Sequence, residues 1–288
     1  MSTLVVGATG FIGPRFIRKL IARGESVVGM DLNPGAATFG GVPIGAPVLR
    51  GDVTQFEDVM RTVLDVKPDR LINLAYGLGA GEGNPHQVMR LDILGMDNCF
   101  EAARLAGVKR VVYASSIAVS GQQKNFGDRP AIEDDPVYGT SQYAMHKIFN
   151  EFQAKKYIKN YGMSIVGVRP ANVTGPDKVR GSVDHVQIMV DAARGRPVHL
   201  PNKGMMRTLI HVEDIAEVFV RVLLAEAPPR RTNLVGARSD RGDNRPRFGC
   251  RPSLRLRFGL HCARSVSLAP HGTTVYRPGA IPPAAGPR

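Results

Sequence analysis

Residues 4–13 read Leu-Val-Val-Gly-Ala-Thr-Gly-Phe-Ile-Gly, and this stretch decides the fold class. An apolar run ends in three glycines, Gly7, Gly10 and Gly13, and a helical pattern follows at once. Glycine permits a tight turn and a close approach of the backbone, and a helix N-terminus presents free N–H groups and a positive dipole end. The stretch therefore predicts a strand, a turn and a helix that bind the phosphates of a dinucleotide.

Short apolar segments alternate with helical patterns up to about residue 170. We expect strands at residues 4–6, 27–30, 47–50, 70–75, 110–115 and 164–168. We expect helices at residues 11–23, 56–64, 88–106 and 142–161. Such alternation indicates a parallel sheet covered on both faces. Residues 1–170 are thus predicted to form an α/β domain with a doubly wound parallel sheet, a Rossmann fold.

The rest of the chain has a looser pattern. Residues 171–229, with helices expected at 186–194 and 212–225, are predicted to form a small substrate-binding cap over the carboxyl ends of the strands, where ligands bind in such folds. Residues 230–288 are rich in Arg, Pro and Gly and lack periodicity, which is typical of a disordered segment.

Composition narrows the functional classes. Among 288 residues, 43% are hydrophobic, and no apolar run approaches the roughly 20 residues that a membrane span needs. Cys99, Cys250 and Cys262 share no metal-like spacing, so we expect free thiols, no metal and a cytoplasmic location. Ten of the thirteen net positive charges lie in residues 230–288. A nucleic-acid partner would depend on that tail alone, and we do not expect one.

Two carboxylates follow expected strands. Asp31 can accept hydrogen bonds from the adenosine ribose and would repel a 2′-phosphate, which favours NAD over NADP; the alternative is a solvated loop aspartate. Asp52, followed by Val53, can hydrogen-bond the adenine amino group. The alternative is a helix cap near Gln55, a position for which Thr54 is also a candidate.

A second constellation lies downstream. Ser115 and Ser116 end the fifth expected strand, and Tyr143 and Lys147 lie at i and i+4 on one helix face. An ammonium near a phenol favours the phenolate. Tyr143 can then exchange a proton with a hydroxyl or carbonyl while a hydride moves to or from a nicotinamide.

These residues resemble one family in order along the chain. The extended short-chain dehydrogenases/reductases, the NAD-dependent epimerase/dehydratase family, share the pattern from Leu4 to about Leu224. The matching motifs are Gly7–Gly13, Asp31, Asp52–Val53, Asn73-Leu74-Ala75, Val112–Ser116, Tyr143-x-x-x-Lys147 with Glu151, Arg169–Pro176 and Ile210–Ala216.

The resemblance implies roles for individual residues. Phe11 and Ile12 would cover the pyrophosphate through their N–H groups, and Leu74 and Ala75 would line the cofactor site. Lys147 would hold the nicotinamide ribose. The residues that we expect to bind NAD are Gly7, Gly10, Phe11, Ile12, Gly13, Asp31, Asp52, Val53, Leu74, Ala75, Tyr143 and Lys147.

The catalytic residues implied in the same way are Ser116, Tyr143 and Lys147, with Ser116 on the reacting substrate oxygen and Tyr143 as acid and base. In nucleotide-sugar members, positions like Asn172 and Arg207 touch the substrate diphosphate, a task that suits the guanidinium fork. The alternatives are a capping asparagine and a surface arginine.

The chain departs from the family pattern at several positions. Ile117 and Ala118 stand where sugar dehydratases have Asp-Glu, so we do not expect dehydration. Ser120 replaces a tyrosine that is a common substrate contact. Asp92 replaces an asparagine and Met96 a threonine, and we expect both to be packing variations.

The similarity fades at residues 233–236, and an Arg/Pro/Gly-rich stretch without Lys or Glu follows. We interpret residues 230–288 as either a disordered tail or an aberrant stretch read out of frame from a GC-rich gene. Resequencing that finds no frame change would remove the second interpretation.

The expected function is 4-epimerisation of a nucleotide sugar by transient hydride transfer to bound NAD, with Tyr143 as acid and base. One alternative is an NAD-dependent dehydrogenase or ketoreductase acting on a non-sugar alcohol or carbonyl. Another is an NAD-binding protein with impaired catalysis. The family often forms dimers through two helices, so a homodimer through residues 88–106 and 142–161 is possible by analogy.

Overall fold

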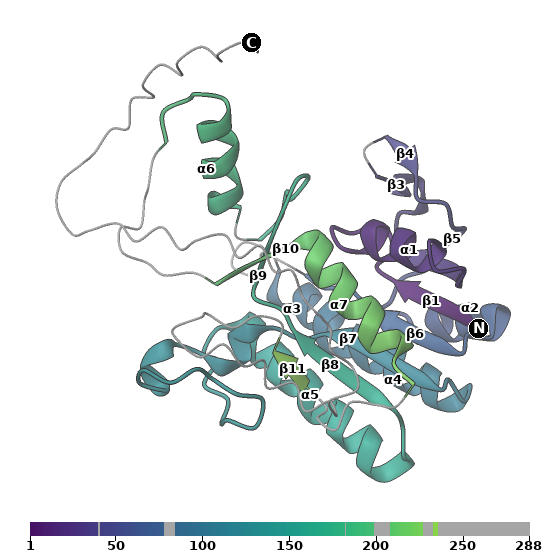
Figure 1. Ribbon diagram of the computed structural model, residues 1–288. Helices are drawn as coiled ribbons and strands as arrows, with labels where there is room; N and C mark the ends of the chain where they lie inside the picture. Colours follow the sequence, from purple (N-terminus) through teal and green to yellow (C-terminus); the bar gives the residue numbers. More distant parts are fainter. Residues whose placement is uncertain (40, 78–83, 182, 199–207, 227–232, 236–288) are drawn as a thin grey trace. The chain divides into compact units, whose positions relative to one another are not determined.

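The computed structural model describes residues 1–39, 41–77, 84–181, 183–198, 208–226 and 233–235 (Figure 1). Of these, residues 183–198 belong to a second compact unit and all the others to the first. The second unit contributes helix α6 (Asp184–Ala193). The site described below lies in the first unit.

The first unit is built on a seven-stranded sheet whose neighbouring strands all pair in parallel. From edge to edge the strands are β11 (Asn233–Val235), β8 (Ile165–Arg169), β7 (Arg110–Ala114), β6 (Arg70–Asn73), β1 (Ser2–Val6), β2 (Ser26–Asp31) and β5 (Val48–Arg50). The chain moves outward from β1 through β2 to β5 and then returns to the other side of β1 at β6. Ligands bind at such a switch point, outside the carboxyl ends of the strands.

Helices cover both faces of this sheet. Because side chains alternate along a strand, Leu4 and Val6 of β1 lie in one core and Val5 lies in the other. The first core is closed by α2 (Phe56–Val66), α4 (Gly95–Leu105) and α5 (Gln142–Tyr161). The second is closed by α1 (Gly13–Ile21) and α7 (Val212–Leu224), which lie side by side (Figure 1). The predicted doubly wound α/β fold is confirmed.

The helix expected at residues 88–106 is a chain of three segments. It consists of α3 (Pro85–Met89), a π-helical turn η2 (Arg90–Leu94) and α4. The π-turn contains the buried Asp92. Wider π-turns inside helices often accompany functional sites, because they change the direction in which a side chain points.

Helix α5 has the predicted bounds, and its ends explain them. The Ser141 hydroxyl accepts a hydrogen bond from the Ala144 N–H at 3.2 Å, which caps the first turn. Gly162 adopts the left-handed conformation, with φ of +67°, and ends the helix. This helix carries Tyr143 and Lys147.

The remaining elements of the first unit are short. They are η1 (Pro34–Ala36), the hairpin of β3 (Thr38–Phe39) and β4 (Val42–Pro43), η3 (Ile117–Ser120), η4 (Gln123–Asn125) and the parallel pair of β9 (Asn172–Thr174) and β10 (Leu209–His211).

Part of the region predicted as a substrate-binding cap packs with the sheet, since α7 contributes Ile215 and Phe219 to the second core. The assignment of residues 171–229 to substrate binding stays a prediction. Within the tail, only residues 233–235 are described, as strand β11. Among the described residues, no helix is both long enough and apolar enough to cross a membrane.

Candidate active site

The glycine turn after β1 is shaped by close backbone packing. A Cβ atom on Gly7 would lie 2.6 Å from the Ala75 nitrogen, and φ of Gly7 is +81°. A Cβ on Gly13 would lie 2.5 Å from the carbonyl oxygens of Gly7 and Ala8. Both positions therefore require glycine for the turn itself, before any ligand is considered.

Gly10 is different, because a Cβ there would meet only the Gly7 oxygen, at 3.3 Å. This contact is tight but less severe than those at Gly7 and Gly13, and close approach of a phosphate would add a further reason for glycine here. The next residues enter α1, whose first N–H groups have no acceptor within the helix. The turn thus fits a dinucleotide pyrophosphate held by the N–H groups of Phe11 and Ile12.

Arg15 is a buried cation that the sequence analysis did not single out. Its guanidinium donates to the Phe11 oxygen at 2.8 Å and to the Pro176 oxygen at 3.0 Å, and it lies 3.3 Å from the Asp177 carboxylate. It therefore joins the glycine turn to the loop after β9. The sequence offered one clue to this contact, because Arg15 comes four residues after Phe11 at the start of the expected helix.

Asp31 lies beside the glycine turn, as its predicted role requires. One carboxylate oxygen accepts the Thr9 N–H at 3.0 Å, and the other accepts the Asn33 N–H at 3.2 Å. The Asp31 carbonyl accepts the Gly51 N–H at 3.0 Å, which brings the start of the next loop close.

The Asp52 side chain makes a local turn. It accepts the Thr54 N–H at 2.9 Å, while helix α2 starts after Gln55 without a side-chain cap. The alternative in which Asp52 or Thr54 caps that helix is therefore wrong. The Val53 carbonyl accepts the Asn98 side-chain amide at 2.9 Å, which fixes this loop against α4.

Leu74 and Ala75 directly follow β6 and lie against the glycine turn. The Asn73 side-chain oxygen accepts the Ala75 N–H at 2.9 Å, and the Leu74 N–H donates to the Val6 oxygen at 2.9 Å. These bonds hold the strand end against Gly7. Residues predicted to line one cofactor site therefore converge from β1, β2 and β6.

Ser116, Tyr143 and Lys147 meet at the carboxyl end of β7. The Ser116 hydroxyl accepts the Ala118 N–H at 3.1 Å, and it lies close enough to the Tyr143 hydroxyl to influence its pKa. The Lys147 Nζ lies 5.7 Å from the centre of the Tyr143 ring. Burial raises the pKa of Tyr143, and the nearby Ser116 hydroxyl acts in the opposite direction.

Lys147 is 2% exposed, and its Nζ donates to the Ala114 oxygen at 2.5 Å. Its Nζ also lies 3.1 Å from the centre of the Tyr76 ring, a cation–π contact. Burial lowers the pKa of Lys147 to about 7, while Asp92 and Glu151 oppose that shift. This lysine therefore loses its proton more readily than a lysine in water does.

Tyr76 is a site residue that the sequence did not reveal. Its ring meets the Tyr143 ring edge-on, with centres 5.2 Å apart. Burial raises the pKa of its hydroxyl well above the usual range. The one clue in the sequence to a role for Tyr76 at the site was its position directly after the Asn73-Leu74-Ala75 motif.

The surroundings of Asp92 do not fit the expectation that this aspartate, which replaces an asparagine, is only a packing variation. It is fully buried, and its carboxylate accepts the Gly77 N–H at 2.8 Å and contacts His146 Nδ1 at 3.0 Å. A buried carboxylate needs polar partners to compensate its loss of hydration, so Asp92 contributes charge and hydrogen bonds and does not merely occupy volume. Met96 does fit the expectation, since it lies in the apolar core.

A buried ion pair supports the strand end that carries the serines. The Ser115 hydroxyl donates to Glu151 at 2.5 Å, and Arg169 grips both Glu151 oxygens at 2.8 and 2.6 Å. Bidentate geometry of this kind fixes direction as well as distance. The network fastens α5 to β7 and β8, and so fixes Tyr143 relative to Ser116.

The predicted substrate contacts are only partly within the described residues. Asn172, on β9, donates its side-chain amide to the Thr208 oxygen at 3.4 Å. Thr208 directly follows Arg207, which lies outside the described residues. Ser120, which stands where a tyrosine was expected, is buried.

Comparison with known proteins agrees with this geometry. The model of the family described as "NAD dependent epimerase/dehydratase family" matches residues 3–236. A UDP-glucose 4-epimerase from Mycolicibacterium smegmatis is 32% identical over 231 residues, which are 77% of this chain and 72% of that protein. A dTDP-4-dehydro-6-deoxy-D-allose reductase from a Streptomyces species is 26% identical over 82% of this chain and 76% of that protein.

Among solved structures, the UDP-glucose 4-epimerase of Thermus thermophilus, in complex with NAD, is 27% identical with a TM-score of 0.69. The match covers 81% of this chain and 76% of that one. From its motifs, its sheet and these similarities, the chain belongs to the NAD-dependent epimerase/dehydratase family of enzymes.

Proposed function

We propose that the protein is an NAD-dependent epimerase that inverts C4 of a nucleotide sugar. The observation that carries this proposal is the meeting of Ser116, Tyr143 and Lys147 at the carboxyl end of β7, where the Lys147 Nζ donates to the Ala114 oxygen and lies 5.7 Å from the centre of the Tyr143 ring. The similarity to UDP-glucose 4-epimerases over more than three quarters of the chain supports the substrate class.

The residues present fit NAD. Gly10 and the start of α1 suit the pyrophosphate, Asp31 suits the ribose hydroxyls, and Lys147 suits the nicotinamide ribose. Asp52, Val53, Leu74 and Ala75 complete the set, with Asp52 on the adenine side. When bound, NAD supplies the acceptor and donor of the hydride.

Tyr143 then moves the proton. As a phenolate it removes the proton from the C4 hydroxyl while the carbon loses a hydride, which leaves a ketone. After the ketone turns its other face, the proton and the hydride both return, so no net oxidation occurs. The Ser116 hydroxyl orients the reacting oxygen, and the Lys147 ammonium stabilises the phenolate.

Asn172 and Arg207 are proposed to hold the diphosphate of the substrate. The Asn172 amide donates to the oxygen of Thr208, the residue that follows Arg207 in the sequence. A guanidinium fork and an amide donor are both suited to phosphate oxygens.

The test starts with the nucleotide content of the purified, denatured protein, followed by incubation with UDP-galactose or UDP-glucose. Near-stoichiometric NAD or NADH and interconversion of the two sugars would support the proposal, and Tyr143→Phe should lose at least about a hundredfold in rate. Absence of binding by any nucleotide sugar, with Arg207→Ala unchanged on the true substrate, would overturn it.

A second candidate is net dehydrogenation or reduction of an alcohol or carbonyl, which the similarity to a reductase favours. That activity needs an exchanging cofactor. A substrate panel read at the absorbance band of reduced nicotinamide separates it from epimerisation. An intact fold that binds NAD and turns over none of these substrates would indicate the third alternative, impaired catalysis.

A further inference from the structure

Asp92 and His146 form a buried polar pair beneath the candidate site. Asp92 is fully buried and His146 is 8% exposed, with 3.0 Å between Asp92 Oδ2 and His146 Nδ1. Gly77 donates its N–H to the other Asp92 oxygen, and the Asn150 amide donates to the Asp92 carbonyl at 3.0 Å. The π-turn and α5 are thus locked together by hydrogen bonds to one residue.

The short contact requires one shared proton. Either His146 donates its Nδ1–H to an ionised Asp92, or a protonated Asp92 donates to the imidazole. With a neutral imidazole and an ionised carboxylate the pair carries one negative charge, and uptake of one more proton makes it neutral. Because both side chains are shielded from water, this charge acts on its neighbours with little screening.

Both partners of the Asp92 carboxylate adjoin the surroundings of Lys147. Gly77 directly follows Tyr76, whose ring centre lies 3.1 Å from the Lys147 Nζ, and His146 directly precedes Lys147 on α5. Burial lowers the pKa of Lys147, and the Asp92 carboxylate opposes that shift. The other carboxylate acting on Lys147 is Glu151, whose two oxygens are both engaged by the Arg169 guanidinium. Asp92 is therefore the carboxylate near Lys147 whose charge no arginine offsets among the described contacts.

We propose that Asp92 and His146 are positioning residues that set the protonation of Lys147. Burial raises the pKa of Asp92, and the hydrogen bonds from His146 and Gly77 oppose that shift. The ionised form of Asp92 that these donors favour in turn favours the ammonium form of Lys147. This inference rests on the proposed role of Lys147 beside Tyr143, because an ammonium there is what stabilises the phenolate.

Three variants separate charge from packing. Asp92→Asn keeps the size and the acceptor for Gly77 but removes the charge. His146→Ala removes the donor, so Asp92 takes up a proton more readily. His146→Asn is the matched control, because its amide nitrogen replaces Nδ1 as donor while it cannot titrate.

The measurement is the titration of Lys147 in the full chain by NMR of its labelled ε-carbon, assigned with Lys147→Met, without substrate or added cofactor. We expect Asp92→Asn and His146→Ala to lower the pH at which Lys147 titrates by about one unit or more, the effect of losing a nearby opposite charge. His146→Asn should leave that titration close to wild type.

An unchanged Lys147 titration in Asp92→Asn, or equal shifts in His146→Ala and His146→Asn, would overturn the inference. If Asp92→Asn does not fold, the two His146 variants still decide the question. Because no substrate enters this measurement, its failure is distinct from failure of the proposed function.

Activity gives a second readout once a substrate is in hand. The alkaline limb of the pH profile of kcat should move to lower pH in Asp92→Asn and His146→Ala. A loss of activity by the same factor at every pH would indicate a structural role alone and would contradict the proposal.

Discussion

The Lys147 Nζ lies 3.1 Å from the centre of the Tyr76 ring, and only 2% of the lysine is exposed. The ammonium has exchanged water for an aromatic face and one carbonyl oxygen, that of Ala114. These partners compensate the loss of hydration only in part, which is why burial lowers the pKa of Lys147 to about 7.

This burial predicts a pH-dependent cost to stability. In the unfolded chain a lysine titrates near pH 10.4, so between about pH 7 and pH 10 the unfolded state binds more protons than the folded one. The cost is fully present below about pH 7 and disappears as the pH rises. Relative to Lys147→Met, the wild type should gain up to about 1.4 kcal/mol of unfolding free energy per pH unit within this window.

Urea unfolding of both proteins at three pH values within the window measures this gain. If the difference in unfolding free energy between the wild type and Lys147→Met does not change with pH, burial has not lowered the pKa of Lys147.

The glycines of the first turn should separate folding from cofactor binding. Gly7→Ala would force a Cβ to 2.6 Å from the Ala75 nitrogen at positive φ, so we expect a loss of several kcal/mol or failure to fold. Gly10→Ala meets only one oxygen at 3.3 Å and should change stability by about 1 kcal/mol or less, while NAD binding weakens at least about tenfold.

The control is Gly24→Ala, at φ of +76° with open space around it, which should cost about 1 kcal/mol and leave NAD affinity unchanged. Thermal unfolding and titration with NADH measure both quantities. Equal NAD affinity in Gly10→Ala and wild type would argue against the pyrophosphate assignment.

The buried ion pair below the serines should be costly to break. Glu151→Gln leaves the Arg169 guanidinium buried without its counter-charge, and we expect a loss of about 3–5 kcal/mol. The matched control is Asp135→Asn, which breaks a bidentate arginine pair with Arg129 on the surface and should cost about 1 kcal/mol or less. Denaturant midpoints at low and high salt compare the two, and similar losses would show that burial does not decide the outcome.

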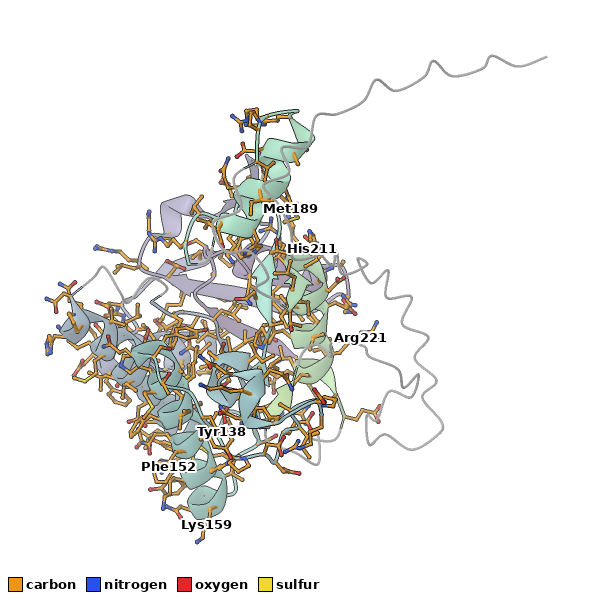
Figure 2. The ribbon with its side chains drawn as sticks, turned by 90° about the vertical axis from the view of Figure 1, so that its left-hand side faces the viewer. Tyr138, Phe152, Lys159, Met189, His211 and Arg221 are labelled. Atoms are coloured by element: carbon orange, nitrogen blue, oxygen red, sulfur yellow. The ribbon has the colours of Figure 1, made fainter. Side chains whose placement is uncertain are left out.

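An apolar stripe on α5 bears on the predicted homodimer. Met145, Phe149 and Phe152 recur at helical spacing and are 52%, 41% and 52% exposed. Figure 2 labels Phe152 on this helix, with Lys159 further toward its C-terminal end. On the neighbouring segments, Leu94 and Leu105 are also exposed.

If a second copy covers this stripe, Phe152→Glu should convert a dimer to a monomer in sedimentation equilibrium. Leu64→Glu on α2 is the matched control, since Leu64 is also 52% exposed but lies outside the two segments predicted to form the dimer. A monomeric wild type, or a Phe152→Glu protein that remains dimeric, would remove the prediction.

The local patterns determined most of the fold. The strand–turn–helix at residues 4–13 was recognisable because glycine at Gly7 and Gly13 is demanded by backbone contacts that no other residue allows. The bounds of α5 followed from Ser141 and Gly162, which act on the helix ends through neighbouring backbone groups. The pairing of Tyr143 with Lys147 needed only the helical repeat.

The tertiary structure alone decided the electrostatics of the site. Asp92, Tyr76 and His146 come from separate segments, and their chemistry depends on distances that the sheet and its helices set. A substitution of asparagine by aspartate reads as a packing variation in a sequence, because burial, the width of a π-turn and the donor facing the carboxylate are not encoded locally. Contacts between distant parts of the chain determine whether a carboxylate is a solvated surface group or a buried charge that acts on a buried lysine. The physical reason is that the interaction between two charges is strong only where water is excluded from around them.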